Sequence, residues 1–261
     1  MNPVRLLIVT AVDAERDAVA RGLGTAAPLT APGLPGRTLL RVTSDEAVSC
    51  GDALGVPSTA RRRPLTADLL TGGVGPAAAA AATGAALTAA AAREDPYDLV
   101  ICAGIAGGFA PVAALGSVVV ADRVIAADLG CETSDGFLSV DSLGFGVTEH
   151  TCPPDLSAAV ARVLGAVHAP VLTVSTVTGT AERARALQRR HAAAAEAMEG
   201  FGAAEAAALH GIPLLEVRTV SNTVGPRDRA AWRVPDALAA LRDAFAVLHS
   251  VLARGAPPPY T

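Results

Sequence analysis

The chain has 261 residues, of which 51% are hydrophobic, and this is enough apolar material for one sizeable core. Its formal net charge of -4 provides no basic face, so nucleic acid and anionic membranes are not expected as partners. We therefore predict a small-molecule ligand and a single domain over residues 1–254, followed by a tail at 255–261.

Short apolar runs alternate with helical stretches along most of the chain. Strands are predicted at Leu6–Thr10, Ala67–Gly72, Leu99–Gly104, Ser117–Ala121, Pro170–Val174 and Leu214–Val220. Helices are predicted at Ala14–Gly22, Pro76–Ala92, Asp155–Leu164, Ala181–Ala195, Ala203–His210 and Pro235–Ala253. Because the strands are apolar and alternate with helices, we expect an α/β protein with three layers, α/β/α, around a mostly parallel sheet.

Residues Thr43–Thr66 do not follow this alternation. They lack periodicity and contain Ser, Gly, Pro and the triplet Arg61–Arg63, so we predict a mobile insertion within the domain. The triplet has phosphate binding as an alternative, but a solvated face is the commoner role of such a run.

The four cysteines show no CxxC or Cys/His spacing, so neither a metal site nor a redox pair is predicted. Idle or buried thiols in a reducing compartment are the expected state. The N-terminal stretch MNPVRLLIVTAVDAER has one Arg and an apolar run that Asp13 interrupts, which is too little for a signal peptide. We therefore expect a cytoplasmic protein.

Two segments place functional groups directly after predicted strands, where ligands bind in parallel α/β sheets. Glu15 opens the helix after the first strand, and there a carboxylate either acts on a ligand or only favours the helix dipole. Gly104, Gly107 and Gly108 predict a glycine-dense turn at which the backbone can approach a ligand closely. The glycines lack GxGxxG spacing, so a nicotinamide cofactor is not predicted.

Two later segments add polar groups to the same predicted edge of the sheet. Met198 and Glu199 precede Gly200 in an Ala-rich region that we expect to be buried, where an unpaired carboxylate is costly. Glu199 therefore needs a charged partner or a substrate hydroxyl. Ser221 and Asn222 end the last predicted strand, and we expect all four segments to face one site.

The segments TAVDAERDAV, TGGVGPAAAAAAT, CAGIAGGFAP, EAMEGFG and VRTVSNTVGPRDRA, in this order, resemble the nucleoside phosphorylase/hydrolase superfamily. Within it the chain is most similar to the futalosine hydrolase family, and methylthioadenosine/S-adenosylhomocysteine nucleosidases are more distant. The resemblance covers nearly all of the chain except Thr43–Thr66 and the tail. It implies a purine nucleoside phosphorylase-like fold with a mixed sheet, a nucleoside substrate, no metal or organic cofactor, a homo-oligomer, and a place in menaquinone biosynthesis.

The resemblance also implies roles for individual residues in the hydrolysis of a purine N-glycosidic bond. Glu15 matches the carboxylate that activates water, and Glu199 matches the residue that binds the ribose hydroxyls and favours the cationic sugar of the transition state. Met198 would pack beneath the ribose. Gly104, Ile105 and Gly107 would line the sugar side of the cavity.

Asn222 is expected to recognise the base. In this resemblance, nucleosidases that release adenine carry Asp at the same position, where its acceptors suit the N7–H and 6-amino donors. The amide of Asn222 instead matches the N7–H donor and O6 acceptor of a 6-oxopurine, which predicts hypoxanthine as the leaving group. The loop at Thr176–Thr180, which contains Thr178, is the alternative place for base recognition.

The stretch GPRDRAAW follows Asn222 and offers Arg227, Arg229 and Trp232. The resemblance implies a substrate with a benzoate beyond the 5′ carbon of its ribose, and a carboxylate in an apolar cavity needs a cationic partner. We predict that Arg227 or Arg229 provides it. The alternative is a surface cluster of charges, which contributes little energy.

Three alternative functions remain at this point. A purine nucleoside phosphorylase would need an anion pocket, but Asp13 and Glu15 repel phosphate, and Ile105 stands where relatives often have Ser or Thr. A phosphorylase remains an alternative, because the sequence does not tell whether the side chain of Arg16 faces the site or solvent. A methylthioadenosine/S-adenosylhomocysteine-type nucleosidase and a non-catalytic nucleoside-binding protein are the other two.

Overall fold

The computed structural model describes residues 4–30, 34, 36–44 and 64–252. The large sheet contains β1 (Val4–Thr10), β2 (Ala26–Thr30), β3 (Thr38–Ser44), β4 (Leu65–Thr71), β5 (Leu99–Gly108), β6 (Val118–Val120), β7 (Arg123–Ala126), β10 (Glu149–Thr151), β11 (Val167–His168), β12 (Val171–Thr173), β13 (Ala195–Ala197) and β14 (Leu214–Thr223). The strands β8 (Gly130–Thr133) and β9 (Gly136–Ser139) form a separate hairpin. The helices are α1 (Asp13–Leu23), α2 (Pro76–Ala91), α3 (Pro154–Leu164), α4 (Ala181–His191), α5 (Gly200–Leu209) and α6 (Val234–Leu252), with a short 3-10 turn η1 (Arg229–Ala231).

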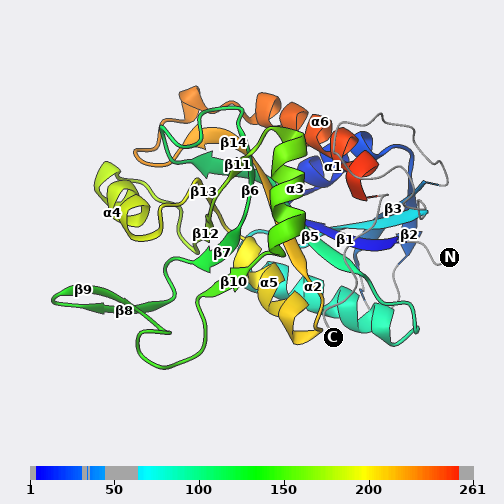
Figure 1. Cartoon of the computed structure of the whole chain (residues 1–261), viewed down its shortest axis with the longest axis horizontal. Coiled ribbons are helices and arrows are strands. Elements are labelled where there is room, and N and C mark those ends of the chain that lie inside the picture. Colours follow the sequence, from blue (N-terminus) through cyan, green and yellow to red (C-terminus); the bar gives the residue numbers. More distant parts are fainter. Residues whose placement is uncertain (1–3, 31–33, 35, 45–63, 253–261) are drawn as a thin grey trace.

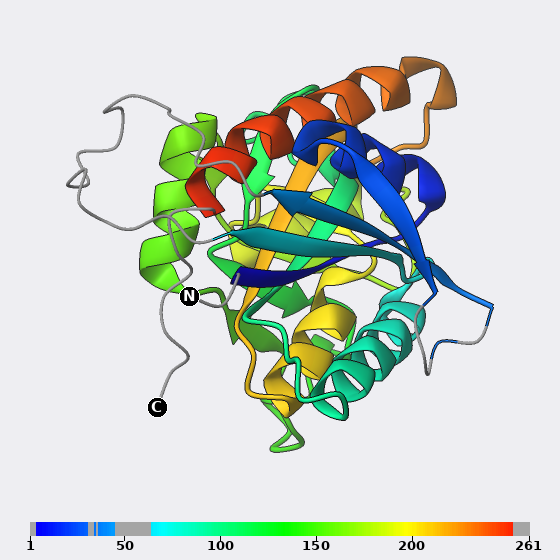
Figure 2. The same cartoon turned by 90° about the vertical axis from the view of Figure 1, so that its right-hand side faces the viewer.

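The large sheet is mixed but mostly parallel at its centre. Strand β1 pairs in parallel with β4 and β5, and β5 pairs in parallel with β14. Antiparallel pairs occur where β13 meets β5 and where β3 meets β4. Helices α1 and α6 cover one face, while α2 and α5 cover the other (Figures 1 and 2). The predicted three-layer α/β/α architecture is therefore confirmed.

The central strands are apolar because both faces of the sheet are covered. All seven residues of β1 are buried, and so are the first six residues of β5. An apolar run without alternation is what a parallel strand between two helical layers requires. Within the described residues, no helix is long and apolar enough to span a membrane.

All six predicted helices are present, but two of their boundaries differ by more than one residue. Helix α4 ends at His191, and the following Ala192 adopts a left-handed conformation with φ of 50°. Ala195, which we predicted to be helical, instead starts strand β13, because sheet pairing with β5 and β12 overrides the helix propensity of alanine. Helix α5 begins at Gly200 rather than at Ala203.

The glycine-dense turn predicted after the central strand is wrong. Strand β5 continues through Gly104 to Gly108 and keeps its pairing with β14 over this stretch. The glycines there serve close packing, since a Cβ at Gly108 would lie 2.4 Å from the carbonyl oxygen of Ala113.

The predicted insertion at Thr43–Thr66 begins within β3 and ends within β4. Residues 45–63, which include the triplet Arg61–Arg63, lie outside the described residues, as does the tail at 255–261. The single domain stays a prediction. The strands β2, β3, β7, β10, β11 and β13 and the hairpin of β8 and β9, which projects from the body in Figure 1, were not predicted.

Helices α2 and α5 pack closely because small residues face each other between them. A Cβ on Gly202 of α5 would lie 2.0 Å from the carbonyl oxygen of Pro76, the first residue of α2. The approach matters for function, because it brings the start of α2 to the start of α5, where Glu199 is located.

We predict that Gly202→Ala lowers the free energy of unfolding by at least about 2 kcal/mol, because the two helices have to separate. The matched control is Gly84→Ala on α2, where the nearest atom to an added Cβ is 3.9 Å away. There the better helix propensity of alanine should leave stability unchanged or raise it by up to about 1 kcal/mol. Urea unfolding measures both variants, and equal effects would contradict the close packing of α2 on α5.

Candidate active site

The side chain of Glu15 extends from the first turn of α1 to strand β5. Its Oε2 accepts hydrogen bonds from the backbone N–H groups of Ala11 at 3.0 Å and Val12 at 3.2 Å, as an acidic residue near a helix start commonly does. Its Oε1 accepts a hydrogen bond from the N–H of Ile105 on β5 at 2.9 Å. Helix capping does not require this last contact, so the buried Glu15 is also fixed to the carboxyl-terminal half of β5.

The environment of Glu15 makes it a stronger base than an exposed carboxylate. Burial raises its pKa above the ordinary value, although Arg218 and the Ile105 N–H favour the charged form and limit the rise. A carboxylate with a raised pKa accepts a proton from water more readily.

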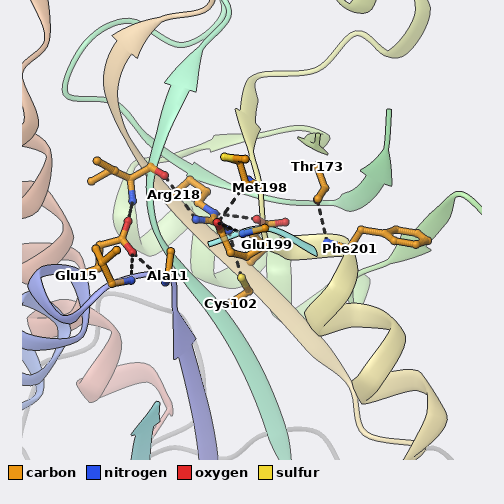
Figure 3. A network of polar contacts seen from close by, with 12 residues as sticks. Ala11, Glu15, Cys102, Thr173, Met198, Glu199, Phe201 and Arg218 are labelled. Atoms are coloured by element: carbon orange, nitrogen blue, oxygen red, sulfur yellow. Dashed lines mark hydrogen bonds and ion pairs between the residues drawn. The ribbon is translucent and has the colours of Figure 1, made fainter. Parts of the chain in front are cut away.

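Arg218 is the centre of this part of the structure, and its side chain is 1% exposed. Its Nε donates to Glu216 Oε1 at 2.8 Å, and its Nη2 lies 3.2 Å from Glu199 Oε2 and 3.2 Å from Cys102 Sγ. Figure 3 shows the guanidinium between Glu15 and Glu199. Burial works against its charge, but Cys102 and the surrounding carboxylates hold the pKa of Arg218 above its usual range.

Glu199 stands at the start of α5 and has three partners. Its Oε2 contacts Arg218 and accepts a hydrogen bond from the N–H of Met198 at 3.4 Å. Its Oε1 accepts one from the N–H of Gly75 at 3.2 Å, and Gly75 has a φ of 96° that favours glycine. The expectation that the buried Glu199 has a charged partner is confirmed by this ion pair.

Two glycines leave the room that these charged groups occupy. A Cβ on Gly104 would lie 2.6 Å from Glu15 Oε1 and 2.8 Å from Arg218 Nη1. A Cβ on Gly200 would lie 2.2 Å from Glu216 Oε2. Burial raises the pKa of Glu216 as well, yet one guanidinium still faces three carboxyl groups. A larger number of carboxyl groups than of cations suits a reaction in which positive charge develops on the ligand.

A cavity of about 330 Å³ lies on β5 and β14, the two strands that also carry this centre, and on β13. Its lining includes Gly107, Thr178, Glu196, Asn222, Arg227 and Trp232. Gly104 and Gly107 are three residues apart on β5, a distance of about 10 Å along a strand. The centre around Arg218 and the cavity are therefore neighbours along β5 and β14.

Asn222 is half-buried at the end of β14 and presents its amide to the cavity. Its Oδ1 accepts a hydrogen bond from the Ser221 hydroxyl at 2.9 Å, and its Nδ2 donates to the carbonyl of Thr223 at 3.2 Å. Each end of the amide keeps one further bonding position, an acceptor on oxygen and a donor on nitrogen. Gly107 leaves space here, because its Cβ would lie 3.2 Å from Asn222 Nδ2.

The structure brings most of the predicted site residues into two adjoining groups. Around Arg218 lie Glu15, Gly104, Ile105, Met198 and Glu199, and the cavity contains Gly107, Thr178, Asn222 and Arg227. Ser221 is buried and contacts Asn222 rather than the cavity. Arg229 is exposed on η1 and does not line the cavity.

Three charged residues of the site were missed by the sequence analysis. Glu216 and Arg218 alternate on one face of the apolar run LLEVRTV, and two opposite charges inside such a strand signal a buried ion pair. Glu196 stands three residues before Glu199 in an Ala-rich stretch. A buried carboxylate in such a stretch needs a partner, so Glu196 could have been recognised from the sequence in the same way as Glu199.

The family of the chain follows from comparison with known proteins. A model of the phosphorylase superfamily matches residues 66–254. A futalosine hydrolase of Streptomyces coelicolor is 56% identical over 250 residues, which are 95% of this chain and 97% of that protein. The chain belongs to the futalosine hydrolase family. A futalosine hydrolase of Acidothermus cellulolyticus is 45% identical over 94% of this chain and 90% of that protein.

The fold extends well beyond the futalosine hydrolase family. The structure of an S-adenosylhomocysteine nucleosidase from Streptococcus pyogenes superimposes with a TM-score of 0.72 over 97% of this chain and 98% of that chain. Sequence identity is only 19%, so this likeness shows the shared fold alone. Together with the superfamily match, it confirms the purine nucleoside phosphorylase-like fold expected from the sequence.

Proposed function

We propose that this chain hydrolyses the N-glycosidic bond of futalosine, releasing hypoxanthine and dehypoxanthinyl futalosine for menaquinone biosynthesis. One observation carries the proposal: two buried carboxylates, Glu15 and Glu199, flank a single guanidinium beside a cavity that presents the amide of Asn222. The family membership supports the same activity, because the relatives with 56% and 45% identity are futalosine hydrolases.

In the proposed reaction, the ribose lies over Met198 and Glu199, and the base enters the cavity. N7 of the purine takes up a proton from solvent, the C1′–N9 bond breaks and its electron pair goes to the purine, while the oxygen of a water molecule bonds to C1′. Glu15 accepts the proton of that water. This proton returns to solvent after the step, so the protons balance. Glu199 binds the ribose hydroxyls, and its charge favours the cationic sugar of the transition state.

Asn222 stabilises the leaving group in this proposal. Its free acceptor position on Oδ1 suits N7–H of the departing hypoxanthine, and its free donor position on Nδ2 suits O6. The Thr223 carbonyl fixes which end of the amide is the donor, because a carbonyl oxygen can only accept and Nδ2 donates to it.

The arrangement around Arg16 favours water over phosphate as the nucleophile. Arg16 pairs with Asp13 at 2.9 Å and with Asp17 at 2.8 Å, so two carboxylates already neutralise its charge. A phosphate at this end of α1 would also meet the carboxylates themselves.

A mixture of futalosine, its 6-amino analogue and inosine, incubated with and without phosphate and separated by chromatography, tests the function. We expect phosphate-independent release of hypoxanthine from futalosine. Release that requires phosphate would identify a phosphorylase, adenine release would identify an adenine-type nucleosidase, and binding without cleavage would identify a nucleoside-binding protein. The homo-oligomer and the cytoplasmic location stay predictions.

We predict that Glu15→Gln and Glu199→Gln each lower turnover at least about 100-fold while the protein stays folded. The first change removes the base that accepts the water proton, and the second removes the charge beside the ribose. Steady-state kinetics and circular dichroism check both outcomes. Near wild-type turnover in either variant would exclude the role assigned to that residue.

We predict that Asn222→Asp shifts preference from futalosine toward its 6-amino analogue. A carboxylate accepts hydrogen bonds from both N7–H and a 6-amino group, whereas it faces the O6 acceptor of hypoxanthine with no donor. The ratio of kcat/KM for the two substrates measures the change. An unchanged ratio would mean that another part of the cavity recognises the base.

We predict that Arg227→Ala raises KM for futalosine by the equivalent of about 1.5–3 kcal/mol and leaves inosine cleavage unchanged. Arg227 lines the cavity, and its guanidinium lies 5.9 Å from the centre of the Trp232 ring, so both suit an aromatic carboxylate. Arg229→Ala is the matched control, because the exposed Arg229 does not line the cavity. Equal losses on futalosine and inosine would mean that Arg227 contacts the base or supports the loop.

A further inference from the structure

Glu196 is a second polar residue of the cavity that the reaction described above does not use. It lies on β13, is 6% exposed, and lines the same cavity as Asn222. Its Oε1 accepts a hydrogen bond from the N–H of Thr178 at 2.8 Å, and its Oε2 accepts one from the Thr178 hydroxyl at 2.5 Å. These two bonds fix the carboxylate in one orientation beside the cavity.

The strand register places Glu196 and Asn222 on opposite sides of one glycine. Glu196 of β13 pairs with Gly107 of β5, and Gly107 pairs with Asn222 of β14 on its other side. Residues paired in this way project to the same face of the sheet. Two strand spacings separate their backbones by about 10 Å, with no side chain between them. The two side chains therefore border the cavity from opposite sides.

The hydrogen bonds of Glu196 leave part of its carboxylate available. A carboxylate has about four acceptor positions, and Thr178 fills two of them. Fixing the loop at Thr178 would need only a neutral acceptor, whereas a buried carboxylate is costly unless further partners bind it. Burial raises the pKa of Glu196 although Thr178 favours its charged form, so a donor from a ligand would stabilise it further.

We infer that Glu196 is a specificity-determining residue that accepts a hydrogen bond from N1–H of the hypoxanthine base while Asn222 binds N7–H and O6. This inference rests on the proposed function and names the second edge by which the base is recognised.

The chemistry of the two purines makes this contact selective. N1 of hypoxanthine carries a hydrogen and donates, whereas N1 of adenine is a lone-pair acceptor. A carboxylate opposite adenine N1 would place two acceptors face to face and leave both without a donor. Glu196 would therefore act together with Asn222, one residue favouring the 6-oxopurine at N1 and the other at N7 and O6.

Internal competition between futalosine and its 6-amino analogue tests the inference in the full-length protein. Both substrates are present in one reaction, so a partly folded variant loses both activities equally and keeps the ratio of their kcat/KM values. We expect Glu196→Gln to lower the preference for futalosine by about 10- to 100-fold, because its amide can donate to adenine N1. The double variant with Asn222→Asp should lower the preference further than either single change.

The matched control is Glu182→Gln, the same chemical change at an exposed residue of α4 that does not line the cavity, and it should leave the ratio unchanged. The wild-type protein adds a test without substitution: a futalosine analogue with C–H in place of N1–H should lose about 10- to 100-fold in kcat/KM. A ratio that Glu196→Gln leaves unchanged, or full activity on that analogue, overturns the inference. No cleavage of futalosine by the wild-type protein would instead refute the proposed function.

Discussion

The ion pairs of Arg218 are the interaction on which the site depends. This one guanidinium is fully enclosed and contacts Glu216 from its own strand and Glu199 from the start of α5. Its charge also lowers the pKa of Glu15, which burial alone would raise further. Removing one partner from such a buried pair typically costs about 3–5 kcal/mol, because the remaining charges lose their compensation. The carboxylates that the chemistry needs can be buried only because this cation lies among them.

Glycines in place of larger residues leave the space that this cation and its carboxylate partners occupy. Gly104 and Gly200 each stand where a Cβ would collide with a carboxyl group or with the guanidinium. Gly107 has the same relation to Asn222 in the neighbouring cavity. Strand β5 thus carries glycines at positions that face functional groups from α1, β13 and β14. The glycine-rich stretch is a paired strand, opposite a register shift between Val220 and Asn222 of β14, and its lack of side chains leaves the room that these groups occupy.

The sequence was sufficient for those features that depend on local pattern. The apolar runs of β1, β5 and β14 and the six helices were predictable because periodicity and length distinguish them. The positions of Glu15 and Glu199 near one edge of the sheet were predictable, because each stands where a strand is followed by a helix. Glu216 and Arg218 were not recognised although their opposite charges alternate on one strand, and the pairing of Arg218 with Glu199 joins segments that only the folded sheet brings together. The glycines of β5 were misinterpreted for the same reason, since their neighbours come from other strands.

The charged centre around Arg218 and the cavity occupy different positions on β5 and β14. On β14, Arg218 belongs to the charged centre and Asn222 to the cavity; on β5, Gly104 and Gly107 make the same division. Strand pairing is a property of the backbone, so this spacing does not depend on which side chain stands at the base-facing position. A substitution there changes the hydrogen bonds offered to a purine without disturbing the ion pairs of Arg218. In the function that we propose, this separation would let a fold shared at 19% identity with an S-adenosylhomocysteine nucleosidase keep one architecture while the residues at the end of β14 and in β13 select the base.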